Sequence, residues 1–226
     1  MRKYLYISIF LLFITYSFPS LPADYSVQIN IPSKTLEVWD GDTVVKTYPV
    51  GVGRKNFPTP TGNFKVISKF SSPTWENPYK AAGEARIYPG KKNPLGTRWI
   101  GFHRNLMGEY GIHGTNEPNS VGKVCSHGCI RMKINNSEDL YDTVPLGTPV
   151  TVTYYTYKIT IKGNKIFVYK YPNPYNRKTD QNGIIYEQLA RISSDYTLNL
   201  LNLDKLKTLK DGERMLIGDI APKQEK

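Results

Sequence analysis

The sequence has very few cysteine and histidine residues, and it is short of acidic residues. Its 226 residues include 2 cysteines, 3 histidines and 19 acidic residues against 30 lysines and arginines, giving a formal net charge of +11. Two cysteines are too few for a disulfide-rich scaffold. There is no internal repeat or low-complexity segment, and 17 tyrosines are too many for a disordered protein. The composition indicates a globular chain with one sizeable domain and an appendage.

Long hydrophobic runs are also missing, apart from one short run at the start of the chain. Residues 1–3 (MRK) precede about fifteen apolar residues, whereas a membrane-spanning helix needs about twenty. The stretch PSLPA that follows ends at Ala23, a small residue suited to cleavage. We predict that residues 1–23 are a cleaved signal peptide of an exported protein. An uncleaved membrane anchor is the alternative.

From residue 25 the pattern predicts a β-rich domain with one short helix. β-branched and aromatic residues alternate or cluster between turn signals, which is typical of strands. The expected strands cover residues 25–31, 34–40, 43–50, 63–70, 98–102, 110–114 and 147–155. We expect a helix in residues 135–147, with Asn136 as its N-cap, acidic residues in its first turn, and Pro145 and Gly147 ending it. Residues 71–94 are expected to form a long surface loop.

The character of the sequence changes after Tyr154. Residues 157–171 predict a hairpin with a two-residue Gly163-Asn164 turn, followed by a loop over residues 171–183. Leucines at helical spacing predict a helix in residues 201–210, and the polar last residues are expected to fray. Residues 154–226 should therefore form a smaller α+β extension of hairpin and helix, packed against the first domain.

Residues 113–131 hold two of the three histidines and both cysteines. A zinc site is one interpretation, but Cys125, His127 and Cys129 are separated by single residues, closer than structural zinc ligands usually are. A disulfide is another. An extended path would put the α-carbons of Cys125 and Cys129 ~13 Å apart, and a bridge requires roughly 4.4–6.8 Å. Only a tight turn would permit it.

A nucleophilic cysteine is the third interpretation. A thiolate nucleophile needs a base, an environment that lowers its pKa, and donors for the oxyanion. Gly128 leaves a carbonyl oxygen free to approach the backbone N–H groups of Gly128 and Cys129. His113, at the end of a predicted strand, can supply the base, and the carbonyl of Gly114 can orient its ring.

These residues resemble the catalytic signature of the L,D-transpeptidase family with the YkuD-type domain. That signature is a His-Gly pair, a gap of about a dozen residues, and then Ser-His-Gly-Cys. In this sequence the matching residues are His113, Gly114, Ser126, His127, Gly128 and Cys129, followed by Ile130, Arg131 and Met132. The upstream TPTG at residues 59–62 resembles the Thr-Pro-x-Gly element of the family. The resemblance covers residues 25–153, so we place a catalytic domain at residues 24–153.

The resemblance implies a β-sandwich or barrel enzyme that acts on peptidoglycan stem peptides in the periplasm or cell wall. Cys129 would attack a tetrapeptide, release D-Ala and pass the acyl group to an amine, which could be another stem, a lysine of an envelope protein or a free amino acid. His113 would move the protons. His127, Gly128, Gly114 and Ser126 would support the oxyanion region, and Arg131 would contact a substrate carboxylate or form a surface ion pair. No metal or other cofactor is implied.

Several alternatives stay open at this stage. The same cysteine could serve an L,D-carboxypeptidase or amidase-like hydrolase, or the chain could be a non-catalytic wall-binding module. The basic charge suits an anionic wall polymer better than nucleic acid in an exported protein, and membrane contact is expected only through residues 1–23 if they are uncleaved. His103 is expected to be structural or a pocket wall. Cys125 lies directly before Ser126, at a position where the family pattern asks only for a small or apolar residue. We hypothesise that, if the loop is tight, oxidation to a Cys125–Cys129 bond would silence the enzyme.

Overall fold

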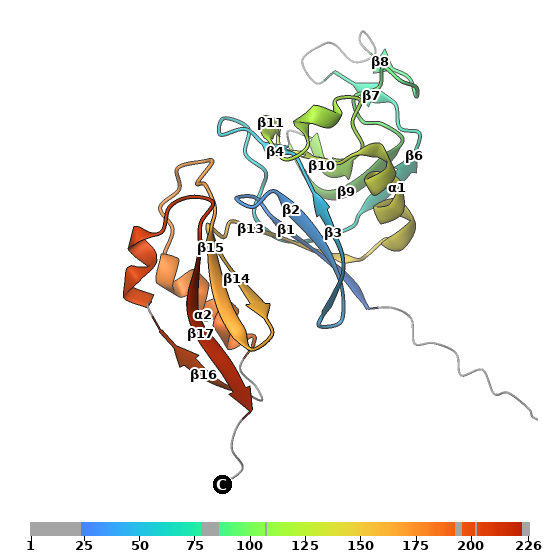
Figure 1. The fold of residues 1–226 in the computed structure, drawn as a ribbon. Helices are drawn as coiled ribbons and strands as arrows, with labels where there is room; N and C mark the ends of the chain where they lie inside the picture. Colours follow the sequence, from blue (N-terminus) through green and yellow to red (C-terminus); the bar gives the residue numbers. More distant parts are fainter. Residues whose placement is uncertain (1–23, 78–85, 107, 193–195, 202, 223–226) are drawn as a thin grey trace, which may run out of the picture.

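The computed structural model describes residues 24–77, 86–106, 108–192, 196–201 and 203–222. The predicted signal peptide, residues 1–23, lies outside the described residues. Two units lie side by side, one coloured blue to yellow and the other orange to red (Figure 1). The first contains the sequence motifs, and the second, the C-terminal unit, follows residue 153. None of the helices in the described part of the chain is both long and apolar enough to cross a membrane.

The first unit is built on two sheets. The five-stranded sheet has the order β3 (Thr43–Pro49), β2 (Thr35–Asp40), β1 (Tyr25–Asn30), β13 (Pro149–Thr153) and β5 (Gly62–Lys65). The four-stranded sheet has the order β12 (Ile130–Arg131), β10 (Gly108–His113), β9 (Arg98–Asn105) and β6 (Ser68–Ser71). Two smaller pairs are β11 (Val124–Ser126) with β4 (Val52–Gly53), and β7 (Trp75–Glu76) with β8 (Arg86–Ile87). The 3-10 helix η1 (Pro118–Ser120) precedes β11. The mostly β fold predicted from sequence is confirmed.

The two sheets enclose one hydrophobic core. Period-2 alternation points one side chain in two to the inside of each strand, and the fully buried residues Ile29, Ile100 and Ile112 come from both sheets. The chain crosses between the sheets at Val66, whose N–H donates to Thr148 O (2.9 Å), while the next N–H donates to Gly101 O (2.8 Å). The prediction of one strand over residues 63–70 is therefore wrong, because this crossing divides it into β5 and β6.

Helix α1 (Ile134–Thr143) packs on this core and directly follows β12. Lys133, rather than Asn136, is its N-cap residue, and the expected acidic residues lie beyond its first turn. They make tertiary contacts instead: Glu138 accepts a hydrogen bond from Thr97 Oγ1 (2.7 Å) and Asp139 pairs with Lys46 (2.5 Å). The predicted end is confirmed, since the helix stops before Pro145.

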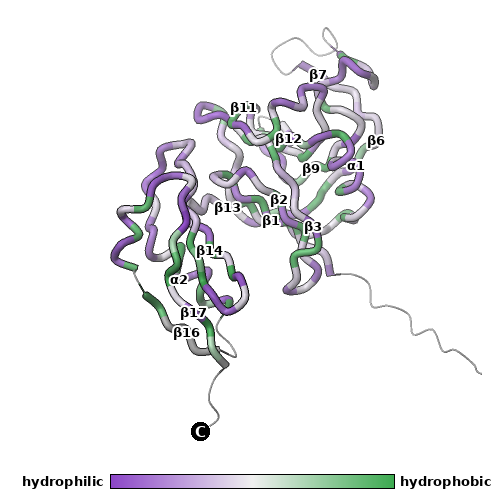
Figure 2. The backbone as a smooth tube through the Cα atoms, viewed as in Figure 1, coloured by the Kyte–Doolittle hydropathy of each residue, from purple (hydrophilic) through white to green (hydrophobic). Residues whose placement is uncertain are grey.

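The C-terminal unit has its own sheet and its own core. The sheet has the order β14 (Tyr157–Lys162), β15 (Lys165–Lys170), β17 (Arg214–Pro222) and β16 (Tyr196–Leu200). The remaining elements are α2 (Gln181–Ala190) and the 3-10 helix η2 (Leu203–Thr208). Buried residues of the sheet and both helices form a second hydrophobic cluster. Figure 2 shows hydrophobic colouring along α2 and β16.

The hairpin with the Gly163-Asn164 turn is confirmed, because Lys162 pairs with Lys165 across it. Two other predictions for this unit are wrong. The expected helix over residues 201–210 is a 3-10 helix, and the loop expected over 171–183 already contains the start of α2. The strand β17 was not predicted, and the polar last residues 223–226 lie outside the described residues. β17 is paired on both sides, with β15 and β16. Both pairings join segments that are far apart in the sequence, so the local pattern alone does not reveal this strand.

Candidate active site

The pairing of β10 with β12 brings the two motif segments together. The strands are parallel, with Ile112 opposite Ile130 and His113 opposite Arg131. Both isoleucines are buried in the core, so the residues that alternate with them face the other side of the sheet. Cys129 directly precedes β12 and lies on the same side as His113. At the usual strand spacing and rise, the α-carbons of Cys129 and His113 are about 8 Å apart.

The imidazole of His113 is held by a backbone carbonyl. Its Nδ1 lies 2.5 Å from Gly114 O. A carbonyl can only accept, so Nδ1 carries the hydrogen and Nε2 is the acceptor in the neutral ring. The indole of Trp99 stacks on the imidazole at 5.8 Å between ring centroids. The hydrogen bond expected between His113 and Gly114 is therefore confirmed.

The environment of His113 keeps the ring neutral. Its side chain is buried, with 4% of the residue exposed. Burial, opposed by the hydrogen bond to Gly114 and assisted by the nearby charge of Arg131, lowers the pKa of His113 to about 4. At neutral pH the ring is therefore unprotonated at Nε2, which is the state a proton acceptor needs.

Cys129 is a thiol at rest rather than a thiolate. Burial raises its pKa, and Glu109 raises it further, although a hydrogen bond from the Gly111 backbone and the charge of Arg131 oppose this. Of the three requirements of a thiolate nucleophile, an environment that lowers the pKa is therefore not met at Cys129 in this structure. The resting pair is a neutral thiol and a neutral imidazole, so proton transfer has to accompany attack on a substrate.

Ser126 braces the segment that carries Cys129. Its hydroxyl donates to Cys129 O (2.5 Å) and accepts a hydrogen bond from Gly128 N–H (3.0 Å). The Gly128 N–H is thus already engaged, which differs from its expected role as an oxyanion donor. In the described part of the chain, the Cys129 N–H has no hydrogen-bond partner. Of the two N–H groups, that of Cys129 is the one available to a substrate.

Gly128 is required by the packing of this segment. Its φ of +112° lies in a region that side chains disfavour. A Cβ atom there would also lie 2.5 Å from the Tyr110 ring. Behind it, Thr59 of the upstream TPTG element donates from Oγ1 to Gly128 O (2.9 Å). The two motifs, far apart in sequence, therefore meet directly.

His127 lies on the exposed side of the segment, away from the core. Its Nε2 contacts the guanidinium of Arg54, and its ring meets Phe57 edge-on at 4.7 Å between centroids. Desolvation and the charges of Arg54 and Arg131 lower its pKa. The side chain of His127 therefore packs against the loop that follows β4.

Arg131 lies close enough to three titratable groups to shift their pKa values. Its charge lowers the pKa of Cys129, His113 and His127. The guanidinium also forms an ion pair with Glu117 at 2.7 Å. The Glu117 side chain is 67% exposed, whereas the Arg131 side chain is 20% exposed. Arg131 was expected either to contact a substrate carboxylate or to form a surface ion pair, and the structure shows the ion pair.

Cys125 is held by contacts of its own, with Ser120 and Gly51. Its thiol donates to Ser120 O at 3.4 Å, and a Cβ atom added to Gly51 would lie 3.2 Å from its sulfur. Cys125 and Cys129 are both free thiols. A bond between them would require Cys125 to leave these contacts, so the redox hypothesis stays a prediction. Within the described ranges, no group of three or more His, Cys, Asp or Glu side chains is placed to hold a metal ion.

Glu109 and Trp99 are site residues that the sequence did not reveal. Glu109 accepts hydrogen bonds from Ser68 Oγ, from Trp99 Nε1 (2.9 Å) and from Arg104 Nη2 (2.5 Å). Burial alone would raise the pKa of Glu109, but these hydrogen bonds outweigh it and lower the pKa. An ionised carboxylate thus fixes the indole that stacks on His113. Neither residue belongs to a motif, and only the pairing of β9 with β10 brings them together.

The comparison with known families agrees with this geometry. The model of the YkuD L,D-transpeptidase catalytic domain matches residues 24–152. The chain belongs to that family. Among curated L,D-transpeptidase homologues, YqjB of Bacillus subtilis is 42% identical over 136 residues, which are 59% of this chain and 73% of that protein. YkuD of Bacillus licheniformis is 33% identical over 129 residues, which are 57% of this chain and 66% of that protein.

The match to the YkuD family stops near the end of β13. The C-terminal unit lies outside it, so most of what the chain shares with its relatives is the first unit. A solved L,D-transpeptidase from Mycobacterium smegmatis aligns with a TM-score of 0.46 and 22% identity over 58% of this chain and 59% of that chain.

Proposed function

We propose that this chain is an L,D-transpeptidase that acts on peptidoglycan stem tetrapeptides through a thioester on Cys129. Membership of the YkuD family supports the class of reaction. The observation that carries the assignment is the placement of Cys129 and His113 on one side of paired strands, with the imidazole Nδ1 bound to Gly114 O. A bound Nδ1 leaves Nε2 as the proton acceptor for the thiol.

In the proposed first half-reaction, the Sγ proton of Cys129 passes to His113 Nε2 as sulfur attacks the carbonyl carbon of the third stem residue. The oxyanion accepts a hydrogen bond from the Cys129 N–H. The carbon–nitrogen bond then breaks, and His113 returns the proton to the departing amine of D-Ala. The product is a thioester between Cys129 and the shortened stem peptide.

In the second half-reaction, an acceptor amine attacks the thioester carbonyl and gives a proton to His113. The carbon–sulfur bond breaks, and the proton returns to the sulfur of Cys129. The acceptor can be the side-chain amine of another stem peptide, a lysine of an envelope protein or a free amino acid. We propose that the reaction takes place outside the cytoplasm, in the periplasm or cell wall, where its substrate lies.

Product analysis tests the function. The protein lacking residues 1–23 is incubated with purified stem tetrapeptide, with and without an added amine, and the products are identified by mass spectrometry. Transfer predicts cross-linked or exchanged peptides together with free D-Ala. Tripeptide and D-Ala as the only products would identify a hydrolase instead, and unchanged tetrapeptide would support a binding module.

A further inference from the structure

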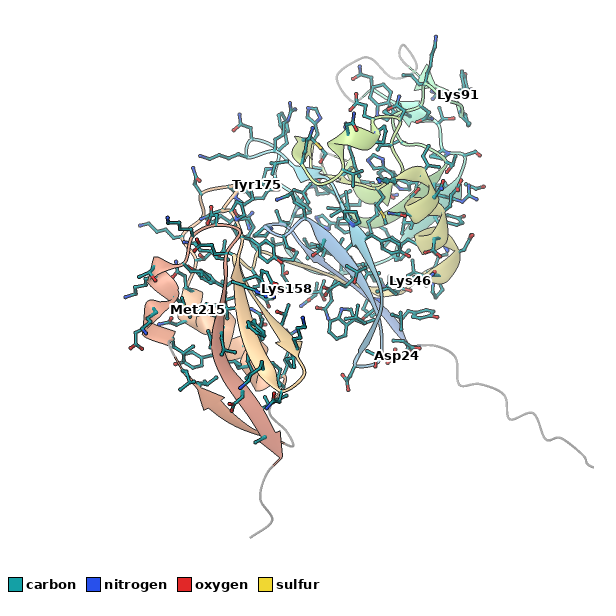
Figure 3. All side chains as sticks on the ribbon, in the orientation of Figure 1. Asp24, Lys46, Lys91, Lys158, Tyr175 and Met215 are labelled. Carbon is teal, nitrogen blue, oxygen red and sulfur yellow. The ribbon has the colours of Figure 1, made fainter. Side chains whose placement is uncertain are left out.

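The loop between β15 and α2 places one side chain of the C-terminal part in the core of the first unit. Tyr175 is 6% exposed and belongs to the first hydrophobic cluster, although it follows β15 in the chain. Figure 3 labels Tyr175 at the boundary between the two units. The family match ends more than twenty residues before it. Tyr175 is therefore a contribution of the C-terminal part to the catalytic unit.

The hydroxyl of Tyr175 closes a ring of buried hydrogen bonds. It donates to Gly53 O (2.8 Å) and accepts from Thr59 N–H (3.2 Å). Gly53 N–H donates to Thr59 Oγ1 (2.9 Å), which completes the ring. Thr59 is fully buried. Every polar group of the ring has a partner, and such satisfied networks specify a single arrangement.

This ring touches the segment that carries the nucleophile. Thr59 Oγ1 donates to Gly128 O (2.9 Å), and Gly128 directly precedes Cys129. Gly53 packs so closely that an added Cβ atom would lie 3.0 Å from Gly128 Cα. Thr59 thus joins the Tyr175 hydroxyl to the backbone beside Cys129 through hydrogen bonds, and Gly53 joins it through close packing.

Residues of the C-terminal part fix the position of Tyr175 itself. Tyr154 Oη accepts from Tyr175 N–H (2.8 Å) and donates to Asn173 Oδ1 (2.6 Å), and the two tyrosine rings stack at 5.3 Å. The guanidinium of Arg177 lies 4.6 Å from the Tyr154 ring and 5.2 Å from the Tyr175 ring. Such cation–π contacts restrict both rings.

We propose that Tyr175 is a positioning residue for acyl transfer. Its hydroxyl holds the loop from Gly53 to Thr59 and, through Thr59, keeps the Gly128–Cys129 backbone where the Cys129 N–H faces the substrate oxyanion. The C-terminal part is then a component of the catalytic apparatus rather than an appended module. The inference rests on the proposed function, because it concerns the geometry of the acyl transfer step.

Tyr175→Phe tests this inference with the least change of shape. The matched control is Tyr155→Phe, which removes a hydroxyl that donates to Glu187 (2.7 Å) in the C-terminal unit. Both are made in a Cys125→Ala background, so that Cys129 is the single thiol. Turnover of tetrapeptide and alkylation of Cys129 by iodoacetamide are measured on each, because alkylation reports access to the thiol and needs no oxyanion donor.

We expect Tyr175→Phe to lower kcat about tenfold or more, because a small misplacement of reacting groups is costly, while KM and the alkylation rate change little. Tyr155→Phe should keep the wild-type kcat. Equal kcat values for Tyr175→Phe and wild type, or equal losses in both variants, would overturn the inference and leave the proposed function standing. A wild-type protein that is never acylated would instead remove the proposed function.

A second variant covers the case in which Tyr175→Phe does not fold. Tyr154→Phe keeps the Tyr175 hydroxyl but removes the oxygen that accepts the Tyr175 N–H. A lower kcat with an unchanged alkylation rate is the expected result, and a kcat equal to that of Tyr155→Phe would overturn the inference.

Discussion

His113 is oriented by the carbonyl oxygen of its own neighbour, Gly114, which lies 2.5 Å from Nδ1. In many catalytic triads a carboxylate performs this task and stabilises the imidazolium electrostatically. A neutral carbonyl fixes the tautomer without supplying a negative charge. The buried ring therefore stays neutral until a proton arrives from Cys129, and the chemistry starts from an uncharged pair.

Replacing His113 should change the acid stability of the protein. Its pKa is about 4 in the folded protein, against an ordinary value of 6.5. Between these values the unfolded chain binds a proton that the folded chain does not, so stability falls as pH drops from 6.5 to 4. His113→Asn should flatten this decline by up to ~1.4 kcal/mol per pH unit. Urea unfolding at pH 7 and pH 5 measures the effect, and parallel declines in both proteins would contradict it.

The thiol of Cys129 should react slowly with small electrophiles at neutral pH. Burial raises its pKa, and Glu109 raises it further. Glu109→Gln should therefore lower the pKa of Cys129 and speed its alkylation by iodoacetamide at pH 7. Glu187→Gln, a change in the C-terminal unit, is the control. The test is the pH dependence of alkylation, measured in a Cys125→Ala background. The same pH dependence with and without Glu109→Gln would contradict this electrostatic explanation.

Removing the charge of Arg131 should move the pH dependence of acylation. That charge lowers the pKa of both His113 and Cys129, so Arg131→Gln should raise both. Protonation of His113 would then begin to inhibit acylation at a higher pH than in the wild type. Rates of acylation measured between pH 4 and 8 test this. If the acylation rate of Arg131→Gln fell at the same acidic pH as that of the wild type, Arg131 would act only through its ion pair with Glu117.

Ser126→Ala should destabilise the fold. The hydroxyl satisfies both Gly128 N–H and Cys129 O in a buried position. A buried polar group without a partner costs about 1–3 kcal/mol. Ser120→Ala, which removes an exposed hydroxyl bonded to Glu117 O (2.6 Å), is the matched control and should change stability by less. Urea titration of both variants compares them, and equal losses would rule out the bracing role of Ser126.

The sequence motif predicted Cys129 and His113 as the central pair, and the structure places both beside the paired strands β10 and β12. The strand pattern predicted several strands of the first unit but not their arrangement in sheets. Local alternation was enough for β1, β2 and β3, because each carries its own signal. Glu109 and Trp99 could not be found in this way. Their contact depends on which residues of β9 and β10 face each other, and a bulge between Tyr110 and Gly111 shifts that register.

The C-terminal unit shows where local signals are too weak. β17 contains Met215, Leu216 and Ile217 but no regular alternation of polar and apolar residues, and it pairs with β15, more than forty residues earlier. Helix α2 contains Asn182 and Gly183, which disfavour helix, yet Ile185 and Leu189 are buried. That spacing of four residues, and the N-cap Asp180, were the signals that could have predicted α2.

The direction in which the pKa of Cys129 is shifted could not be predicted from the sequence. A motif specifies which residues are neighbours, but a pKa depends on how deeply they are buried and on charges from other strands. Glu109 and Arg131 act on Cys129 in opposite directions. Only the folded positions decide that burial dominates and that the thiol is neutral.

The most direct measurement is the intact mass of the protein after brief exposure to stem tetrapeptide under reducing conditions, followed by an acid quench. The account predicts a species heavier by the tetrapeptide less D-Ala, present in the wild type and in Cys125→Ala, and missing in Cys129→Ala. An unmodified wild-type protein in the presence of a competent tetrapeptide, or the same adduct in Cys129→Ala, would contradict it.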